Sequence, residues 1–179
     1  MDLLIKKIIE KKNPTVAGLD PKLDYVPEYI IRKNFEKYGA NLEGAANAIL
    51  EFNKGLIDSL CEIVPAVKPQ SAYYEMYGPH GVMALYETVK YAKEKGLYVI
   101  LDGKRNDIGA TSEAYATAYL GKAKIEENKF EEGFGADSLT VNGYLGTDGI
   151  SPFVNTFENG KTIFVLVKTS KKSSGELQD

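Results

Sequence analysis

Charged and hydroxyl side chains stand directly after four apolar runs of this 179-residue chain, where they could carry out chemistry. These positions are Asp20, Lys68, the pair Asp102 and Lys104, and the pair Thr169 and Ser170. In α/β folds the carboxyl ends of the strands face the ligand-binding crevice. Carboxylates and ammonium groups that meet there can stabilise charge and transfer protons, so we expect a site on this rim.

The strongest of these signals is the pair that follows Leu97–Leu101. Residues i and i+2 of a strand point to the same face, which places Asp102 and Lys104 together, about 7 Å apart along the strand. Opposite charges at the mouth of a buried strand are expected to pair. Asp107 follows three residues after Lys104, in the segment that enters the next predicted helix.

Each of the other residues also has an ordinary structural interpretation. Asp107 could be the N-cap of a helix, which is a common use of Asp. Asp20 precedes Pro21 and could initiate a turn, and Lys68 could be an exposed loop lysine. Taken singly these residues are weak evidence, whereas their common position at strand ends indicates a site.

The elements that would position these side chains alternate along the chain. Nearly continuous apolar runs predict strands over 15–19, 63–67, 97–101, 137–142 and 162–167, and helical spacing predicts helices over 3–12, 39–60, 80–95 and 108–120. Continuous rather than alternating apolar runs are typical of parallel strands covered on both faces. We therefore expect one α/β domain over 1–179, either a barrel or an open doubly wound sheet.

Composition excludes several classes of protein. The 22 basic and 25 acidic residues give a net charge of −3, without the basic excess of a nucleic-acid-binding protein. One Cys and one His cannot build a zinc site or an internal disulfide. No apolar run approaches the roughly 20 residues of a membrane span, and the N-terminus lacks the apolar core of a signal peptide. These features predict a soluble, cytoplasmic protein.

The glycine-rich segments do not indicate nucleotide binding. The G-x-G of Gly133–Gly135 precedes a predicted strand, whereas a dinucleotide fingerprint follows one. The Gly-Lys-Thr of 160–162 lacks the upstream glycine of a P-loop. We expect the segment Gly143–Gly149, after the fourth strand, to be a mobile loop.

Three motifs carry a family resemblance. Residues 101–109 have the form D-x-K-x-x-D-I, Gly-Leu-Asp-Pro stands at 18–21, and Val-Lys-Pro-Gln-Ser-Ala-Tyr-Tyr-Glu stands at 67–75. With the Val-Lys-Thr-Ser of 167–170, the chain resembles the orotidine 5′-phosphate decarboxylases, and most of all their longer bacterial branch. The resemblance extends along essentially the whole chain.

The resemblance implies a (β/α)₈ barrel that acts as a homodimer and converts orotidine 5′-phosphate to UMP and CO₂ without a metal or an organic cofactor. It assigns Lys68, Asp102, Lys104 and Asp107 to an alternating charge array. Asp20 would bind the ribose and Ser170 the pyrimidine. Asp107 and Thr111 would reach the site of the neighbouring subunit.

The implied chemistry suits these residue types. Loss of CO₂ leaves a carbanion at C6 of the pyrimidine, and a fixed ammonium group in a water-poor site stabilises such charge. Lys104 would take this role and then protonate C6. Asp102 would lie against the departing carboxylate. Lys68 and Asp107 would keep these two groups ionised and aligned.

The chain departs from the family in length. A barrel of this type needs roughly 250 residues and eight strands, whereas five strands are predicted here. We therefore expect only about the first five βα units, and weak or no activity from this chain alone. Two alternatives are a non-catalytic barrel fragment and a Mg²⁺-dependent sugar-phosphate decarboxylase or aldolase of the same superfamily. The second alternative places a metal-binding Glu where this chain has Lys68, whose charge would repel Mg²⁺.

Overall fold

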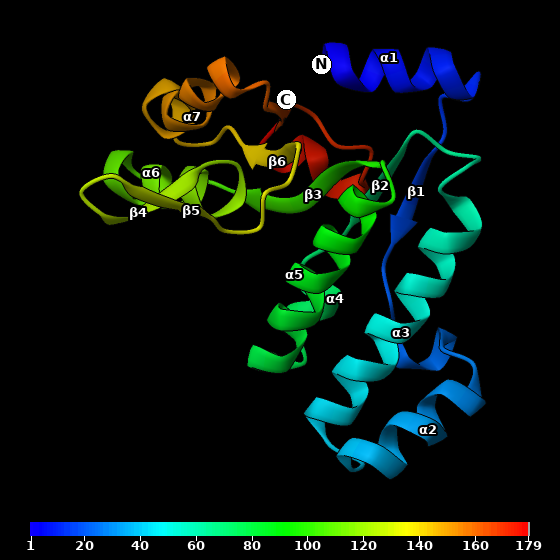
Figure 1. The fold of residues 1–179 in the computed structure, drawn as a ribbon. Coiled ribbons are helices and arrows are strands. Elements are labelled where there is room, and N and C mark those ends of the chain that lie inside the picture. The colour runs from blue at the N-terminus through cyan, green and yellow to red at the C-terminus, as the bar shows by residue number, and fades with distance from the viewer. Residues whose placement is uncertain (179) are drawn as a thin grey trace.

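Five parallel strands form one sheet in the computed structural model, which describes residues 1–178 (Figure 1). The strand order is β1-β2-β3-β6-β7, and every neighbouring pair is parallel. The strands are β1 (Val16–Leu19), β2 (Ala66–Pro69), β3 (Tyr98–Arg105), β6 (Ser138–Asn142) and β7 (Thr162–Leu166). Because the strands are parallel, their five carboxyl ends lie along the same edge of the sheet.

Helices connect the strands, as expected of an α/β fold. They are α1 (Asp2–Lys11), α2 (Glu28–Tyr38), α3 (Leu42–Leu60), α4 (Ala72–Glu75), α5 (Gly78–Glu94), α6 (Gly109–Tyr119) and α7 (Gly146–Val154). Short 3₁₀ segments cover Leu23–Tyr25, Asn155–Asn159 and Lys172–Glu176. The long helices α3 and α5 run side by side (Figure 1) and share a hydrogen bond from Asn53 to Thr88.

Apolar side chains cover both faces of the central strands. Val99 and Leu101 of β3 are fully buried in the main core, together with side chains of α3 and α5. Tyr98 and Ile100, which alternate with them, join Leu4 of α1 in a second cluster. This alternation of two buried faces explains why the strand is a continuous apolar run in the sequence.

The boundaries of the long helices follow from local signals. The side chain of Asn41 accepts a hydrogen bond from the backbone N–H of Gly44 and caps the start of α3. Gly96, the second residue after α5, adopts φ 77°. A left-handed residue at this place is a common helix stop, and glycine adopts it without strain.

The helices α2, α4 and α7 and the strands β4 and β5 were not predicted from the sequence. An antiparallel hairpin of β4 (Lys122–Glu126) and β5 (Lys129–Glu132) follows α6, and α2 precedes α3. Every residue of the hairpin strands is exposed, so no apolar run marks them. The expectation of a loop over Gly143–Gly149 is wrong in its second half, because α7 begins at Gly146.

The predicted fold class is confirmed. The five-stranded parallel sheet and its helices form part of a (β/α)₈ barrel, with β1 and β7 as the two outer strands of the sheet. Within residues 1–178, no helix is long and apolar enough to span a membrane.

Candidate active site

Two ammonium groups converge on one carboxylate at the carboxyl ends of β2 and β3. Nζ of Lys68 lies 2.7 Å from Oδ2 of Asp102, and Nζ of Lys104 lies 2.6 Å from Oδ1. Each carboxylate oxygen therefore has an ammonium partner of its own. The Asp102 side chain is 9% exposed, against 34% for Lys68 and 46% for Lys104. The carboxylate is thus the buried centre of the cluster, and the two lysines are its more exposed members.

The parallel sheet positions these side chains. Lys68 on β2 pairs in register with Gly18 on β1, two residues before Asp20. On the other side of β2, Gln70 forms a backbone bridge with Asp102 of β3. The adjacent residue Ser71 donates to the backbone carbonyl of Asp102 from both its N–H and its hydroxyl group. These contacts fix the backbone on which the carboxylate stands.

The backbone of β3 is irregular where the cluster forms. Its pairing with β6 shifts register between Leu101 and Arg105, and Lys104 adopts φ 48°. Left-handed backbone is uncommon for a residue other than glycine. In spite of this irregularity, Asp102 and Lys104 project to one side, as their i, i+2 spacing predicts.

Sequence reasoning missed Thr140 of β6. Its hydroxyl group donates to Oδ1 of Asp102 at 2.8 Å and accepts the backbone N–H of Lys104 at 2.9 Å. Its sequence signal is weak, because it is one of two hydroxyl residues, with Ser138, inside a predicted strand.

The ionised state of Asp102 is stabilised by its partners. Burial raises the pKa of the carboxyl, but hydrogen bonds from the two ammonium groups and from Thr140, with the charge of Lys68, outweigh burial. The pKa of Asp102 therefore lies below its ordinary value, and the cluster contains a carboxylate at neutral pH.

Arg105 anchors the end of β3. Its guanidinium group pairs with Glu75, donates to the Tyr119 hydroxyl at 3.0 Å, and donates to the Gly103 carbonyl at 3.1 Å. It also lies over the rings of Tyr115 and Tyr119. Burial lowers the pKa of Arg105, and the contacts with Tyr119 and Glu75 more than reverse this effect.

Asp20 lies at the same edge of the sheet but does not join the cluster. It is exposed and directly follows β1, whose last carbonyl, of Leu19, accepts hydrogen bonds from the Gln70 N–H and the Tyr74 hydroxyl. Within residues 1–178, Asp20 has no hydrogen bond to Lys68 or Asp102.

Asp107 and Thr111 are outside the cluster as well. Oδ1 of Asp107 accepts the N–H of Ile108 at 2.7 Å, and Thr111 is exposed on the first turn of α6. The interpretation of Asp107 as an N-cap is wrong. The N-cap of α6 is Ile108, whose side chain makes no capping hydrogen bond. In the described part of the chain, Asp107 makes no ion pair with Lys68 or Lys104.

Ser170 is exposed beyond the end of β7. Its neighbour Thr169 donates its backbone N–H to the Gln178 side chain and lines a hollow of about 760 Å³ at the carboxyl ends of β6 and β7. The structure therefore places Ser170 on the rim that holds the charge cluster.

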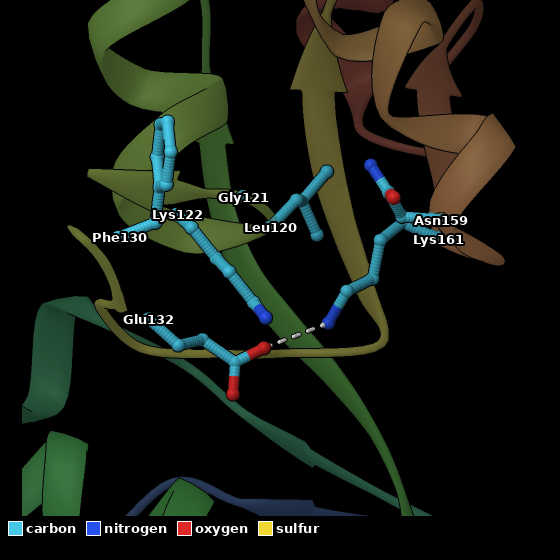
Figure 2. A pocket seen from close by; sticks show the side chains of 7 residues that line it. All are labelled: Leu120, Gly121, Lys122, Phe130, Glu132, Asn159 and Lys161. Atoms are coloured by element: carbon cyan, nitrogen blue, oxygen red, sulfur yellow. Dashed lines mark hydrogen bonds and ion pairs between the residues drawn. The ribbon is translucent and has the colours of Figure 1, made fainter. Parts of the chain in front are cut away.

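A second hollow, of about 650 Å³, lies at the opposite end of the strands (Figure 2). Its floor includes Lys161, which precedes β7 and donates to the Ala136 carbonyl at 2.9 Å and to Glu132 at 3.4 Å. Burial and the nearby charge of Lys93 lower the pKa of Lys161. Its hydrogen bonds to backbone carbonyls give this lysine a structural task, and catalytic sites of α/β barrels lie at the other end.

The fold and the cluster together define a class of protein: an α/β barrel-type chain with alternating charges at the carboxyl ends of its strands. A family profile described as orotidine 5′-phosphate decarboxylase / HUMPS matches residues 48–179. The chain belongs to this family.

Curated relatives carry the name of one activity in that family. An orotidine 5′-phosphate decarboxylase of Caldicellulosiruptor saccharolyticus is 41% identical over 179 residues, covering 99% of this chain and 58% of that protein. One of Rhodopirellula baltica is 43% identical over 173 residues, covering 96% and 55%. The chain thus spans little more than half the length of these relatives.

Solved structures agree with the fold. Leishmania donovani OMP decarboxylase superposes with a TM-score of 0.72 at 31% identity, covering 99% of this chain and 56% of that one. The Plasmodium berghei orotidine 5′-monophosphate decarboxylase gives a TM-score of 0.78, covering 99% and 64%; its 20% identity supports the fold alone.

Proposed function

We propose that this charge cluster decarboxylates orotidine 5′-phosphate to UMP and CO₂, a step of pyrimidine biosynthesis. The observation that carries the proposal is the pair of ammonium groups held at 2.7 and 2.6 Å from the two oxygens of Asp102. Membership of the family and the printed names of the curated relatives support the same activity.

The charges suit the proposed reaction. The ammonium group of Lys104 would lie where negative charge develops at C6 and would then deliver a proton to that carbon. Asp102 would keep Lys104 charged and oriented, and would lie near the departing carboxylate of the substrate. Lys68, on the other oxygen, would prevent Asp102 from turning away.

The remaining site residues complete the proposal. Asp20 would bind the ribose, and Ser170 would bind the pyrimidine from the same rim. Asp107 and Thr111 would act across a homodimer interface, which accords with the absence of a contact between Asp107 and the lysines of its own chain within residues 1–178. The proposed enzyme is cytoplasmic and uses no cofactor.

The metal-dependent alternative is less well supported. In that alternative Asp102 would have to bind Mg²⁺, but each of its oxygens already accepts a hydrogen bond from a lysine ammonium group. A divalent cation beside two ammonium groups would be repelled. Within residues 1–178, no three His, Cys, Asp or Glu side chains gather in a group that could hold a metal ion.

The direct test is release of labelled CO₂ from carboxyl-labelled orotidine 5′-phosphate. The assay would use this chain and a chimera that continues after residue 178 with the corresponding part of the Caldicellulosiruptor saccharolyticus relative. We expect turnover in at least the chimera, and none in either protein when Lys104→Ala is introduced. Turnover that survives Lys104→Ala would contradict the role assigned to this lysine.

A binding measurement separates catalysis from a non-catalytic role. Calorimetric titration of both proteins with 6-azaUMP, a UMP analogue, is expected to show binding that Asp20→Ala weakens. If neither protein binds the analogue or releases CO₂, the site is non-catalytic and the proposal fails.

A further inference from the structure

Thr140 connects the backbone of one charged residue to the side chain of another. Its hydroxyl lies 2.8 Å from Oδ1 of Asp102 and 2.9 Å from the backbone nitrogen of Lys104. Lys104 closes the ring, because its own ammonium group lies 2.6 Å from the same Oδ1. Thr140, Lys104 and Asp102 therefore form a closed circuit of three hydrogen bonds.

The direction of each hydrogen bond is fixed by chemistry. A hydroxyl has one proton to donate and lone pairs to accept with. The backbone N–H of Lys104 can only donate, and an ionised Asp102 can only accept. The hydroxyl of Thr140 must therefore donate its proton to Asp102 while it accepts the N–H of Lys104. Only this orientation of the hydroxyl forms both hydrogen bonds.

The backbone that Thr140 holds is strained. Lys104 has φ 48°, a left-handed conformation that is sterically unfavourable for an L residue with a Cβ atom. Such strain persists only where the surroundings hold the residue in place. The ladder between β3 and β6 is irregular between Leu101 and Arg105, and the Thr140 side chain binds the Lys104 N–H there.

The residue type suits this task. A β-branched side chain has a restricted χ1 angle, so the hydroxyl of a threonine in a strand points in a defined direction. Serine would supply the same hydroxyl group with more rotational freedom. Valine would preserve the shape and remove both hydrogen bonds.

We propose that Thr140 is a positioning residue, whose hydroxyl sets the separation and direction of the Lys104 ammonium group relative to the Asp102 carboxylate. It acts through these two residues and needs no contact with a substrate. The catalytic consequence rests on the proposed decarboxylase function, whereas the positioning itself is a property of this chain.

The first experiment needs no enzymatic activity. The pH titration of the Asp102 carboxyl carbon would be followed by NMR in this chain, in Thr140→Val and in Thr140→Ser. Loss of one hydrogen bond to the carboxylate is expected to raise the pKa of Asp102 by roughly 0.5–1 unit in the valine variant. The serine variant should retain most of the original value.

Thr162→Val is the matched control. Thr162 is a buried threonine at the amino end of β7, where its hydroxyl pairs with that of Tyr98 at 2.7 Å. The same chemical change there should leave the Asp102 titration unaltered. An unaltered Asp102 titration in Thr140→Val, or an equal shift in Thr162→Val, would overturn the proposal.

A measurement on the unsubstituted chain covers the case in which the valine variant does not fold. A hydroxyl proton held by Asp102 exchanges slowly with water and should show cross-relaxation with the amide proton of Lys104. A Thr140 hydroxyl proton that exchanges rapidly, with no cross-relaxation to Lys104, would refute the circuit.

The second experiment uses whichever protein decarboxylates, the chain or its chimera. Thr140→Val is expected to lower kcat about 10-fold or more with little change in KM, because misalignment of the charges acts on the transition state. Thr140→Ser should recover most of kcat, and Thr162→Val should keep it. If no preparation is active, the proposed function fails, and the NMR titration still decides the role of Thr140.

Discussion

The ammonium group of Lys104 lies 2.6 Å from Oδ1 of Asp102, two residues earlier on the same strand, although Lys104 itself has left-handed backbone. A regular strand residue has φ near −120°. The strain is therefore located at the residue whose side chain is proposed to act, a frequent arrangement in active sites. The ion pair and the unusual backbone belong to one local structure.

Removing the side chain of Lys104 should reveal this strain. Lys104→Gly is expected to be more stable than Lys104→Ala by about 1 kcal/mol, because glycine adopts positive φ without the steric cost of a Cβ atom. Chemical denaturation of the two variants measures the difference.

An exposed lysine in a helix provides the control. At Lys90 of α5 the order should reverse, with glycine less stable than alanine by about 1 kcal/mol. Equal stability of the two Lys104 variants, or a preference for alanine there, would show that the left-handed backbone is not retained.

The stability supplied by Asp102 should depend on pH. The pKa of its carboxyl is lower in the folded protein than the ordinary value of about 3.9. The carboxylate therefore stabilises the fold fully above that value, and this contribution is lost as the pH falls through the folded pKa. Asp102→Asn should lower the free energy of unfolding by about 1–3 kcal/mol near pH 7, and by less near pH 2.

Urea denaturation at both pH values tests this expectation. Glu36→Gln, which changes an exposed carboxylate of α2, is the control and should alter stability by less than about 0.5 kcal/mol. A loss in Asp102→Asn that stays constant down to pH 2 would argue against an ionised, stabilising carboxylate.

The sequence predicted the sheet well because parallel strands buried on both faces are continuous apolar runs. Tyr98–Leu101 is buried throughout and is such a run. The hairpin of Lys122–Glu132 was not found, because its exposed strands carry no apolar pattern. The helix Glu28–Tyr38 is rich in charged residues and buries only Ile30 and Asn34, so little apolar sequence marks it.

Part of the site was predictable for a related reason. Lys68 and Asp102 each directly follow an apolar run. Because the carboxyl ends of neighbouring parallel strands lie side by side, the two side chains must lie close together. Thr140 was not predictable, because its contact with Asp102 depends on the irregular pairing of β3 with β6. The left-handed backbone of Lys104 lies in the same irregular stretch and also has no local sequence signal.

Arg105 should contribute to stability through the shape of its side chain as well as its charge. Its guanidinium group joins Glu75, Tyr119 and the Gly103 carbonyl and stacks on aromatic rings, a geometry that a lysine cannot reproduce. Arg105→Met and Arg105→Lys are each expected to lower the free energy of unfolding by about 1–3 kcal/mol.

Arg32 is a suitable control for that experiment. It is an exposed arginine of α2 that pairs with Glu28 one turn away, and Arg32→Met should change stability by less than about 0.5 kcal/mol. If Arg105→Lys were as stable as the unsubstituted protein, charge alone would account for the role of Arg105.

A mixture of two inactive variants should regain activity if Asp107 serves the partner's site. Its carboxylate accepts the N–H of Ile108 and, within residues 1–178, makes no ion pair with the lysines of its own chain. In a heterodimer of Asp102→Ala and Asp107→Ala, one site would carry both substitutions and the other neither. Random pairing should then restore about one quarter of the unsubstituted activity. The measurement is CO₂ release by mixed, refolded subunits of whichever preparation is active.

The control mixture pairs Asp102→Ala with Lys104→Ala. Both of these residues belong to the same chain's cluster, where their charged groups are 2.6 Å apart. Every site in that heterodimer lacks one of them, so no activity should return. Recovery in the control would show that Asp102 and Lys104 do not act in one site, whereas no recovery with Asp107→Ala in verified heterodimers would place Asp107 in the site of its own chain. Its carboxylate would then have to leave the Ile108 amide and turn toward Lys104, a rearrangement that a substrate-bound structure would reveal.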